Sequence, residues 1–531
     1  MADWVCEVCL VPNDNDTAAC CCCTTPRPKS ANPPTDPVLS QETTELSEAV
    51  ENGGTEAEVK EERKKQTRAR RSRNEPPRAR RYFNPARLPR TTVFVVGSSE
   101  VDQLPRQMCD VRRTSKSKEV ESLFECSRPT PIVDGIQGTV AAVACGSLHT
   151  ALLMRRGHVY TFGCNDMGAL GRDVAEAEKH EVPECNPYIV RMRNVVTRVS
   201  CGDNHTLFLT SNGAVFFAGA FRDTAGNIGI PDFSDLEKLT NAGQVKTPVA
   251  LPCGEEGSTP IKDICSGENH CLLLPAGGAG VYVLGSNEFG QLMLPEGYKP
   301  VVPTEEDPDL SVEGTAKLAL TWPQFLTLSG MGLEAPTDGH RVKRRKYGDE
   351  FIERIFAGYC TSFVETGVGH RIYGAGRNAQ GELGCGSDDL FVRQPRELTA
   401  LRDLRIRKIV GGQYFSVALT AGGKLFTWGN SCYTGHGGDD DFAKQTKPTR
   451  LTFFKANVQD VFVGADATFA LTIRGRLFAW GSAQNYILGN GQDYSFQKTP
   501  MVVPVRYFRG FRVVGGMGGS QHTVFLCKRL T

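Results

Sequence analysis

Six copies of one pattern constrain this chain more than any other feature of its 531 residues. Each copy passes from a segment of the Gly-x-x-His type through an apolar run and a glycine turn to a second apolar run and a further glycine. A lone second half, Thr92–Gly97, precedes the first copy, and a lone first half, Gly519–Leu526, follows the last. The turn glycines are Gly157, Gly213, Gly280, Gly369, Gly423 and Gly475. Joined in space, the two halves make a seventh unit, so the array is expected to close into a ring.

Each copy has the local chemistry of a β-hairpin. His149–Met154 and His158–Gly163 are strand-length apolar runs, rich in β-formers and separated by a glycine turn. Neighbouring turns lie between 52 and 89 residues apart, a spacing typical of propeller blades with insertions near residues 230–246 and 295–350. One such unit cannot bury both its faces alone, and stacking in a circle supplies the core. The fold predicted is therefore all-β, a seven-bladed β-propeller over residues 91–531, closed by N- and C-terminal half-repeats.

Composition excludes several classes of protein. The chain is 40% hydrophobic and 23% charged, which is ordinary for a globular protein. No apolar run approaches the roughly 18 residues of a membrane span, and the N-terminus lacks a signal-peptide pattern. Six of the 19 cysteines fall within the first 23 residues. This clustering favours an intracellular protein with reduced thiols and a metal site over a disulfide-rich secreted one.

Residues 1–30 have the pattern W-x-C-x2-C-x3-N-x6-C-x2-C. Four thiolates arranged as two knuckles satisfy tetrahedral zinc, and so small a module would need the metal to fold. Cys21 and Cys22 lie between the second pair and are not expected to be ligands. The predicted structural zinc ligands are Cys6, Cys9, Cys20 and Cys23.

This spacing, together with Trp4, resembles the zinc finger of Ran-binding nucleoporins. The Leu10-Val11 pair and the segment Thr24–Pro28 look like the subclass that binds the GTPase Ran, whereas sister subclasses bind ubiquitin or single-stranded RNA. The resemblance implies that Leu10, Val11 and Asn13 touch the partner. The alternative is that Leu10 and Val11 only pack the finger.

Two segments of opposite character follow the finger. Residues 31–59 are rich in Pro, Thr, Ser and Glu, a composition typical of a disordered acidic linker. Residues 60–90 form a basic arm expected to bind DNA phosphates, import receptors or both. A second basic cluster, residues 340–346, could do the same or be a solvated loop. The arm residues singled out for DNA and import-receptor binding are Arg63, Lys64, Lys65, Arg68, Arg70, Arg71 and Arg73.

The blade sequences resemble the regulator-of-chromosome-condensation family, chromatin-bound guanine-nucleotide exchange factors for Ran. The likeness runs from about Thr91 to the C-terminus and rests on Cys201–Thr206 with Gly213–Gly229, on Thr161–Arg172 and on Gly475–Gly489. The stretch Phe-Arg-Asp-x-x-Gly-x-Ile at residues 221–228 is specific to the exchange factor itself. General members of the repeat family share only the glycines.

In that family the stretch forms a β-wedge that projects into Ran's nucleotide site. Independently of the resemblance, residues 222–227 interrupt a strand pattern with polar, turn-forming residues, which indicates a protruding turn. The alternative is an ordinary surface hairpin tip. The residues implied to drive exchange are Phe221, Arg222, Asp223, Thr224, Ala225, Gly226, Asn227 and Ile228.

The family also places loop residues of one face against Ran. Glu100 replaces a shorter carboxylate, Asn269 stands where the family has an aspartate beside Glu268, and Tyr414 stands where it has a histidine. Asn269 has lost charge and Tyr414 cannot become a cation near pH 7. The alternative for the repeated histidines His149, His205, His270 and His522 is that each caps its own blade loop. The implied Ran-binding residues of the propeller are Glu100, His149, Asp203, Glu268, Asn269, Tyr414 and His522.

The function expected is that of a nuclear, chromatin-associated exchange factor that releases GDP from Ran without covalent chemistry, for nucleocytoplasmic transport and mitosis. Its expected partners are Ran, the histones and DNA backbone of the nucleosome, and import receptors. No membrane partner is expected. No small-molecule substrate of its own is expected either, since no nucleotide-binding glycine loop, metal-hydrolase helix or nucleophile elbow occurs in the sequence. Two alternatives remain: a propeller adaptor that docks Ran or nucleosomes without exchange, and a ubiquitin- or RNA-binding nuclear module.

Overall fold

The computed structural model describes residues 88–113, 120–122, 124–172, 183–223, 226–227, 244–254, 259–298, 319–333, 351–367 and 369–530, and the backbone of residues 4–5 and 12–13. Two compact units are distinguished along the chain: residues 1–83 with 110–123, and residues 84–109 with 124–531. In the first unit, β1 (Trp4–Val5) pairs with β2 (Pro12–Asn13), and β4 (Val111–Arg113) pairs with β5 (Val120–Ser122).

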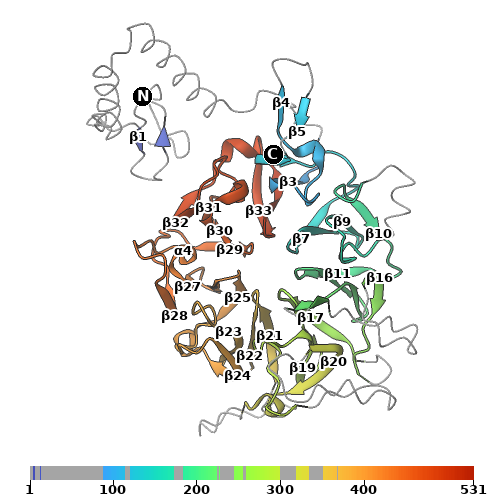
Figure 1. Ribbon diagram of the computed structural model, residues 1–531, viewed down its shortest axis with the longest axis vertical. Coiled ribbons are helices and arrows are strands. Elements are labelled where there is room, and N and C mark those ends of the chain that lie inside the picture. The colour runs from blue at the N-terminus through green and yellow to red at the C-terminus, as the bar shows by residue number, and fades with distance from the viewer. Residues whose placement is uncertain are drawn as a thin grey trace, which may run out of the picture. The chain divides into compact units, whose positions relative to one another are not determined.

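The second unit is a ring of seven four-stranded antiparallel sheets, numbered here as blades (Figure 1). Blade 1 contains β33 (Phe511–Gly518), β34 (His522–Arg529), β3 (Thr91–Ser98) and β6 (Glu125–Pro131). Blade 2 contains β7 (Val140–Cys145), β8 (His149–Met154), β9 (Val159–Gly163) and β10 (Tyr188–Val190). Blade 3 contains β11 (Val196–Cys201), β12 (His205–Thr210), β13 (Val215–Gly219) and β16 (Val245–Ala250). Blade 4 contains β17 (Ile261–Ser266), β18 (His270–Pro275), β19 (Gly280–Ser286) and β20 (Ala319–Thr327).

The remaining blades repeat the same order. Blade 5 contains β21 (Ile352–Ala357), β22 (Thr361–Thr366), β23 (Ile372–Arg377) and β24 (Phe391–Glu397). Blade 6 contains β25 (Ile406–Gly411), β26 (Phe415–Thr420), β27 (Leu425–Asn430) and β28 (Lys444–Arg450), and blade 7 contains β29 (Val458–Val463), β30 (Ala467–Thr472), β31 (Leu477–Ser482) and β32 (Phe496–Val502). Short helical turns lie in the connections: α4 (Ser431–Thr434), η2 (Arg106–Met108), η6 (Ser329–Met331), η7 (Thr399–Leu401), η8 (Gln484–Tyr486) and η9 (Val505–Phe508).

Strands from the two ends of the array close the ring, as the half-repeats predict. β3 pairs with β34 from Thr91 opposite Lys528 to Gly97 opposite His522. β33 of this composite blade packs against both β7 and β29, so every blade has two neighbours. The all-β, seven-bladed propeller is therefore confirmed.

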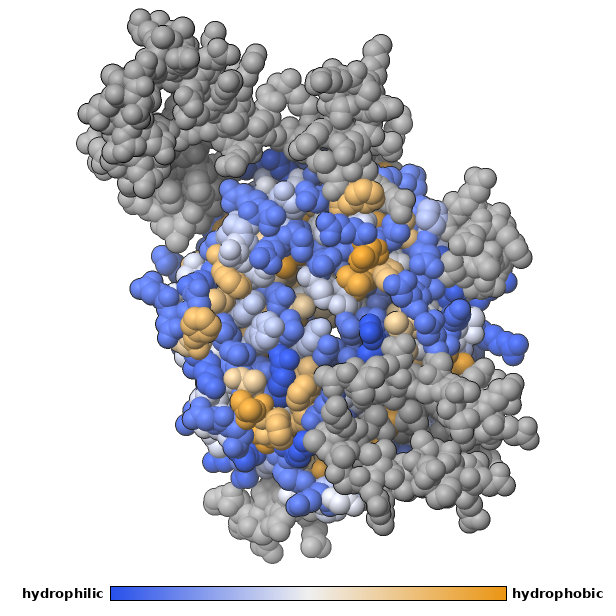
Figure 2. Space-filling view, viewed as in Figure 1, coloured by the Kyte–Doolittle hydropathy of each residue, from blue (hydrophilic) through white to orange (hydrophobic). Residues whose placement is uncertain are grey.

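The second strands of five blades are buried along their whole length. Every residue of β8, β12, β18, β26 and β30 is buried, because these strands have a partner on each side and a neighbouring blade on each face. The face of the molecule in Figure 2 is mostly hydrophilic, with apolar side chains in small separate groups. Among the described residues, no helix combines the length and the apolar character needed to cross a bilayer.

One turn differs from the sequence-based prediction. In blade 4 the turn between β18 and β19 is made at Gly278, which has a φ of +66°, and Gly280 is the first residue of β19. The two glycines are only two residues apart, and the repeat pattern does not distinguish them. The other five predicted turn glycines all have positive φ, as a tight hairpin of this kind requires.

Candidate functional site

Two kinds of loop meet at one rim of the propeller. The inner loops join the first and second strands of each blade, as at residues 202–204, and the outer loops join the third and fourth. The opposite rim holds the turns between second and third strands and the connections from blade to blade. We call the first the hairpin rim, because the outer loop of its blade 3 contains β14 (Arg222–Asp223) and β15 (Gly226–Asn227). We call the opposite rim the turn rim.

The hairpin leaves blade 3 at the hairpin rim. β14 and β15 pair with each other in a two-stranded sheet of their own, with Arg222 opposite Asn227. They follow Gly219, which pairs with His205 at the start of β12 and so marks the hairpin-rim end of the blade. The segment does not continue its blade's sheet, which agrees with the turn predicted from its polar residues. Thr224, Ala225 and Ile228 lie outside the described residues, and Asp223, Gly226 and Asn227 are described through their backbone alone.

Phe221 does not belong to the exposed part of this hairpin. Its side chain is fully buried, with ring centroids 4.8 Å from His205 and 5.1 Å from Phe217. A residue in this position cannot contact a partner, so its predicted contact role is corrected to an anchoring one. Burial of a large aromatic ring fixes the point at which the hairpin leaves the core.

Asn269 holds the hairpin from the neighbouring blade. Its Oδ1 accepts a hydrogen bond of 2.7 Å from the backbone N–H of Arg222, which is exposed. Asn269 belongs to the inner loop of blade 4, so the bond joins the hairpin of blade 3 to the next blade. An aspartate could accept the same bond, because an amide and a carboxylate both offer an acceptor oxygen.

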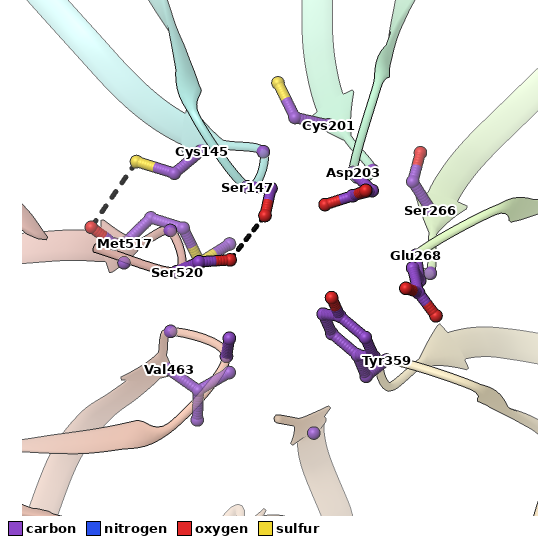
Figure 3. A pocket seen from close by; sticks show the side chains of 18 of the residues that line it. Cys145, Ser147, Cys201, Asp203, Ser266, Glu268, Tyr359, Val463, Met517 and Ser520 are labelled. Atoms are coloured by element: carbon purple, nitrogen blue, oxygen red, sulfur yellow. Dashed lines mark hydrogen bonds between the residues drawn. The ribbon is translucent and has the colours of Figure 1, made fainter. Parts of the chain in front are cut away.

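The inner loops surround a central cavity of about 120 Å³. Figure 3 shows the side chains of Ser147, Asp203, Glu268, Tyr359 and Ser520 directed toward its middle. The loops are joined around the axis by backbone hydrogen bonds from one blade to the next. The N–H of Asp203 donates to the carbonyl of Glu268 at 2.7 Å, and the N–H of Glu268 donates to that of Tyr359 at 2.6 Å. The mouth of the cavity is therefore a preformed ring of loops.

Two carboxyl groups from neighbouring inner loops, those of Asp203 and Glu268, line this cavity. Burial raises the pKa of Asp203 above its usual range, opposed by hydrogen bonds from Ser147 and Asn204 and by the charge of Arg222. Burial also raises the pKa of Glu268, and the nearby charge of Asp203 raises it further. The Cys360 thiol donates to Glu268 at 2.9 Å. Both predicted carboxylates thus line the cavity and are half-buried.

The repeated histidines are buried, and this corrects the partner contacts predicted for His149 and His522. His149 is 1% exposed and His522 is 0% exposed. The ring Nε2 of His149 lies 2.9 Å from the Thr206 hydroxyl, and that of His522 lies 3.0 Å from the Thr150 hydroxyl, each in the next blade. Burial lowers the pKa of His149 to about 4 and that of His522 to about 3, so both rings are neutral at pH 7. They link blades rather than meet a partner.

His205 and His270 make the same kind of link. The Nε2 of His270 lies 2.9 Å from the Ser362 hydroxyl, and the Nε2 of His205 lies 3.1 Å from the Cys271 sulfur. The glycine three residues earlier in each loop leaves room for the ring. A Cβ on Gly202 would overlap both the His205 ring and the carbonyl oxygen of Gly267. The Gly-x-x-His pattern is therefore a packing device for stacking blades.

Tyr414 and Glu100 both lie on the hairpin rim. Tyr414, half-buried in the blade 6 inner loop, has the Arg377 guanidinium 5.4 Å from its ring centroid and the Tyr433 ring at 5.6 Å. Arg377 also pairs with Glu382 at 2.7 Å. The cation absent at Tyr414 is thus supplied next to it by arginine. Glu100 follows β3 and is exposed.

Sequence reasoning missed one carboxyl group of this face. Asp466 occupies the inner loop of blade 7, and its Oδ1 is buried without a hydrogen-bond partner. Burial raises the pKa of Asp466 to about 6. The signal that could have found it is its position immediately before Ala467, which takes the place of the repeated histidine. No histidine marks that loop, so the repeat pattern does not single it out.

Charge is divided between the two rims. In the described loops of the hairpin rim the cations with described side chains are Arg172 and Arg222. The acids with described side chains there are Glu100, Asp102, Asp166, Glu184, Asp203, Glu268, Glu288, Glu296, Glu382, Asp388, Asp389, Asp439, Asp440, Asp441, Asp466 and Asp493. The described turn-rim connections have the acids Asp134 and Asp403. Their cations are Arg155, Arg156, Arg191, Arg193, Arg371, Arg402, Arg405, Lys424, Lys455, Arg474, Arg476, Arg506 and Arg509. In the described loops, one rim of the ring is therefore acidic and the other is basic.

Several predicted residues fall outside the described part of the chain. These are the finger positions Leu10 and Val11, with Asn13 described only as backbone of β2. The four predicted zinc ligands Cys6, Cys9, Cys20 and Cys23 also lie there. So do residues 31–59, the basic arm and the cluster at residues 340–346.

Comparison with known proteins agrees with this architecture. The family model for the RCC1-like domain matches residues 92–525. The human protein named Regulator of chromosome condensation is 31% identical over 408 residues, which cover 76% of this chain and 86% of the human protein. The ultraviolet-B receptor UVR8 of Arabidopsis thaliana is 27% identical over 387 residues, 68% of this chain and 81% of the receptor. The crystal structure of Prp20p from Saccharomyces cerevisiae matches with a TM-score of 0.64 at 22% identity, covering 83% of this chain and 92% of Prp20p. The chain therefore belongs to the RCC1-like family of β-propeller proteins.

Proposed function

We propose that this protein is a guanine-nucleotide exchange factor for the small GTPase Ran. One observation carries the proposal: a separate hairpin, anchored by Phe221 and Asn269, leaves the propeller at the rim where Asp203 and Glu268 face the cavity. The hairpin offers a projecting element and the ring of loops offers a preformed platform around it. The 31% identity to the human Regulator of chromosome condensation supports this assignment.

The mechanism needs no covalent step. The hairpin enters the nucleotide site of the GTPase and competes with the contacts that hold GDP. If the exchange factor weakens nucleotide binding, nucleotide must weaken binding of the factor by the same ratio. Each tenfold gain in release corresponds to about 1.4 kcal/mol of preferential binding to the nucleotide-free GTPase. The platform supplies this binding energy while Asn269 keeps the hairpin in position.

The turn rim and the basic arm support a role on chromatin in the nucleus. Prp20p is described by its binding to Gsp1p and histones, and a second structure shows it bound to Kap60. We extend these partner classes to the present chain: a GTPase at the hairpin rim, and histones, DNA phosphates and an import receptor at the basic arm and turn rim. DNA contacts of this kind are electrostatic and weaken steeply with salt.

The N-terminal finger is proposed to bind zinc through Cys6, Cys9, Cys20 and Cys23 and to hold Ran·GDP through Leu10, Val11 and Asn13. Structural zinc in such a module would stabilise its fold. A flexible linker between finger and propeller would raise the local concentration of the captured GTPase. Chelation is expected to abolish capture by the finger and leave exchange by the propeller detectable.

The deciding experiment is release of fluorescent GDP from purified Ran with and without the full chain. Accelerated release is expected, and it should be lost when Asp223 and Asn227 are both replaced by alanine. Removal of residues 1–30 serves as the comparison, because it should reduce capture of Ran·GDP while exchange persists. Release no faster than the spontaneous rate would exclude the exchange function.

A non-catalytic adaptor is the second candidate. Tyr414 stands where the resemblance implies a histidine, and the family includes an ultraviolet-B receptor at 27% identity. An adaptor would bind Ran or nucleosomes and leave the rate of GDP release unchanged. Binding with unchanged release therefore distinguishes the two candidates.

A further inference from the structure

Three successive blades carry the same eight-residue sequence pattern within or at the end of their outer loops on the hairpin rim. The loops of blades 5, 6 and 7 read Gly-x-Gly-x-Asp-x-x-Phe at residues 384–391, 435–442 and 489–496. All six glycines have φ between +70° and +82°, a conformation that other residues adopt only with strain. The glycines therefore set similar turns in the three blades, but Phe391 and Phe496 begin their fourth strands, whereas Phe442 lies two residues before Lys444, the first residue of β28.

These loops leave apolar side chains in solvent. Phe442 is 89% exposed, Leu390 64%, Phe391 43% and Phe496 38%. Rings in such positions lose favourable burial energy of about 25 cal/mol per Å² until a partner covers them. Isolated exposed apolar residues are common, but a repeated set on adjacent loops of one rim marks an interaction surface. We call these three loops the acidic-aromatic arc.

The arc is also negatively charged. The three octapeptides contain Asp388, Asp389, Asp439, Asp440, Asp441 and Asp493, and neither lysine nor arginine. Asp389 pairs with Arg396 at 2.8 Å, and Asp441 pairs with Lys498. The other four acids make no ion pair with any residue that the structure describes. The Arg393 guanidinium lies 4.8 Å from the centroid of the Phe391 ring, so this ring already has a cation beside it. The four acids without an ion pair, near the exposed ring of Phe442, favour a partner segment with cations and apolar side chains.

Contacts between the loops make the arc one continuous surface. The Asn430 side chain donates to Gln380 at 3.1 Å, and the backbone N–H of Gly386 donates to the carbonyl of Thr446 at 2.8 Å, which together join blades 5 and 6. Lys498 donates to the carbonyl of Gly438 at 3.1 Å and joins blade 7 to blade 6. The Phe496 ring packs edge-on against Tyr433 at 5.6 Å. A partner therefore meets a preformed surface.

The position of the arc relative to the hairpin limits what can bind it. Both lie on the same rim, with the hairpin on blade 3 and the arc on blades 5 to 7. Figure 1 shows the strands of blade 3 and those of blades 6 and 7 on different sides of the ring, and the inner loops line the central cavity. A protein whose nucleotide site receives the hairpin extends over that cavity toward the arc.

We propose that the acidic-aromatic arc is a second docking site for the GTPase, and that it binds a lysine- or arginine-rich segment with an exposed apolar side chain. This inference rests on the proposed exchange function and adds a contact beyond the hairpin. The arc strengthens the encounter and holds the bound GTPase, whereas the hairpin displaces the nucleotide. Loss of the arc therefore weakens binding without slowing release from the bound complex.

The test compares two full-chain variants with a matched control. The first replaces Asp388, Asp439 and Asp493 with asparagine, and the second is Phe442→Ser. Each is expected to raise the KM for GDP-loaded Ran about tenfold, equal to about 1.4 kcal/mol, with kcat within about twofold of the unaltered chain. The asparagine variant should also flatten the dependence of KM on salt. Ile473→Ser, an equally apolar side chain 62% exposed on the turn rim, should change neither constant.

The outcomes separate this inference from the proposed function. If both arc variants exchange normally, with KM values equal to that of Ile473→Ser, the proposed docking role of the arc is wrong and the exchange function is unaffected. If the arc variants bind Ran more weakly but the unaltered chain does not accelerate GDP release, the exchange function is wrong and the docking role of the arc is supported. Absence of both binding and release would overturn both. A change in self-association of the chain, measured by light scattering, with no change in Ran binding would identify a second copy as the occupant and overturn the proposal.

Discussion

Asn269 is the residue on which the hairpin's position depends most. It gives the described hairpin backbone a side-chain hydrogen bond from the neighbouring blade, at 2.7 Å. We expect Asn269→Leu to lower the kcat of GDP release about five- to tenfold, because one hydrogen bond of this kind contributes about 1 kcal/mol. Asn269→Asp keeps the acceptor and should retain most of the activity. The measurement is stopped-flow release of fluorescent GDP.

Two results would contradict this role of Asn269. One is an equal loss of activity in Asn269→Asp and Asn269→Leu, which would show that the amide is needed for something other than accepting the bond. The other is a loss in Asn212→Leu, an exposed asparagine in a turn-rim loop, which would indicate a general effect on the propeller. Thermal melting of all three variants checks that the fold is retained.

At this scale the sequence predicted loop membership better than side-chain direction. Asp203 and His205 lie two residues apart in one Gly-x-x-His segment, yet the carboxyl group faces the cavity and the ring packs beneath Phe221. The difference arises from the next blade, whose Cys271 receives the histidine. A linear pattern contains no information on that neighbour, so the histidines could not be assigned from spacing alone. The burial of Phe221 was not predicted for the same reason, because the linear pattern does not show which residues pack around it.

At the scale of elements, the second strands of blades 1 to 4 are linked by buried histidines at their starts. Burial holds the pKa of His270 at about 4 and that of His522 at about 3, below the ordinary value near 6.5. Between pH 6.5 and the folded-state values, the unfolded chain binds more protons than the folded chain. Stability contributed by these neutral rings is therefore fully present above about pH 6.5 and is lost as the pH falls.

The free energy of unfolding should accordingly decline from pH 7 to pH 5 by about 2 kcal/mol for each such histidine. His522→Gln is expected to be less stable at pH 7 but to show a shallower decline than the unaltered chain. His158→Gln, at an exposed turn position, should show the same slope as the unaltered chain. Urea titrations at a series of pH values measure the slopes. Equal slopes of unfolding free energy against pH for His522→Gln and the unaltered chain would exclude this contribution of His522 to the pH dependence of stability.

The strands themselves were largely predictable, whereas the outer loops were not. Alternating glycine and apolar runs specify strand, turn and strand, and only Gly280 was assigned to the wrong side of a turn. The arc was missed because its exposed rings sit in short loops that read as ordinary connections. Phe442 is 89% exposed, and the repeat pattern does not distinguish an exposed ring in a loop from a buried one.

At the scale of the whole molecule, closure was predictable and charge separation was not. The half-repeats complement each other in the linear sequence, so the sequence alone predicts the composite blade. The acids of the hairpin rim come from many separate loops and gather only when the blades are stacked. A chain with a net charge of +1 therefore presents two strongly charged faces, which can steer an acidic and a basic partner to opposite sides.

The stability of the closed propeller should depend on the composite blade. β3 pairs with β34 over seven residue pairs, and Val93, Phe94, Val95 and Val96 are buried. A chain shortened to residues 88–531 keeps this strand and should melt cooperatively, at the temperature of the full chain within a few degrees. A chain shortened to residues 99–531 leaves β34 and β6 without the strand between them, exposes a sheet edge and uncovers the aromatic cluster around Phe94. Burial of four such side chains is worth about 1.5–3 kcal/mol each, comparable to the stability of an entire domain, so the shorter chain should aggregate or melt without cooperativity. Calorimetry and light scattering of the two chains make the comparison, and a cooperative melt of residues 99–531 near the temperature of the full chain would show that six blades close without the N-terminal strand.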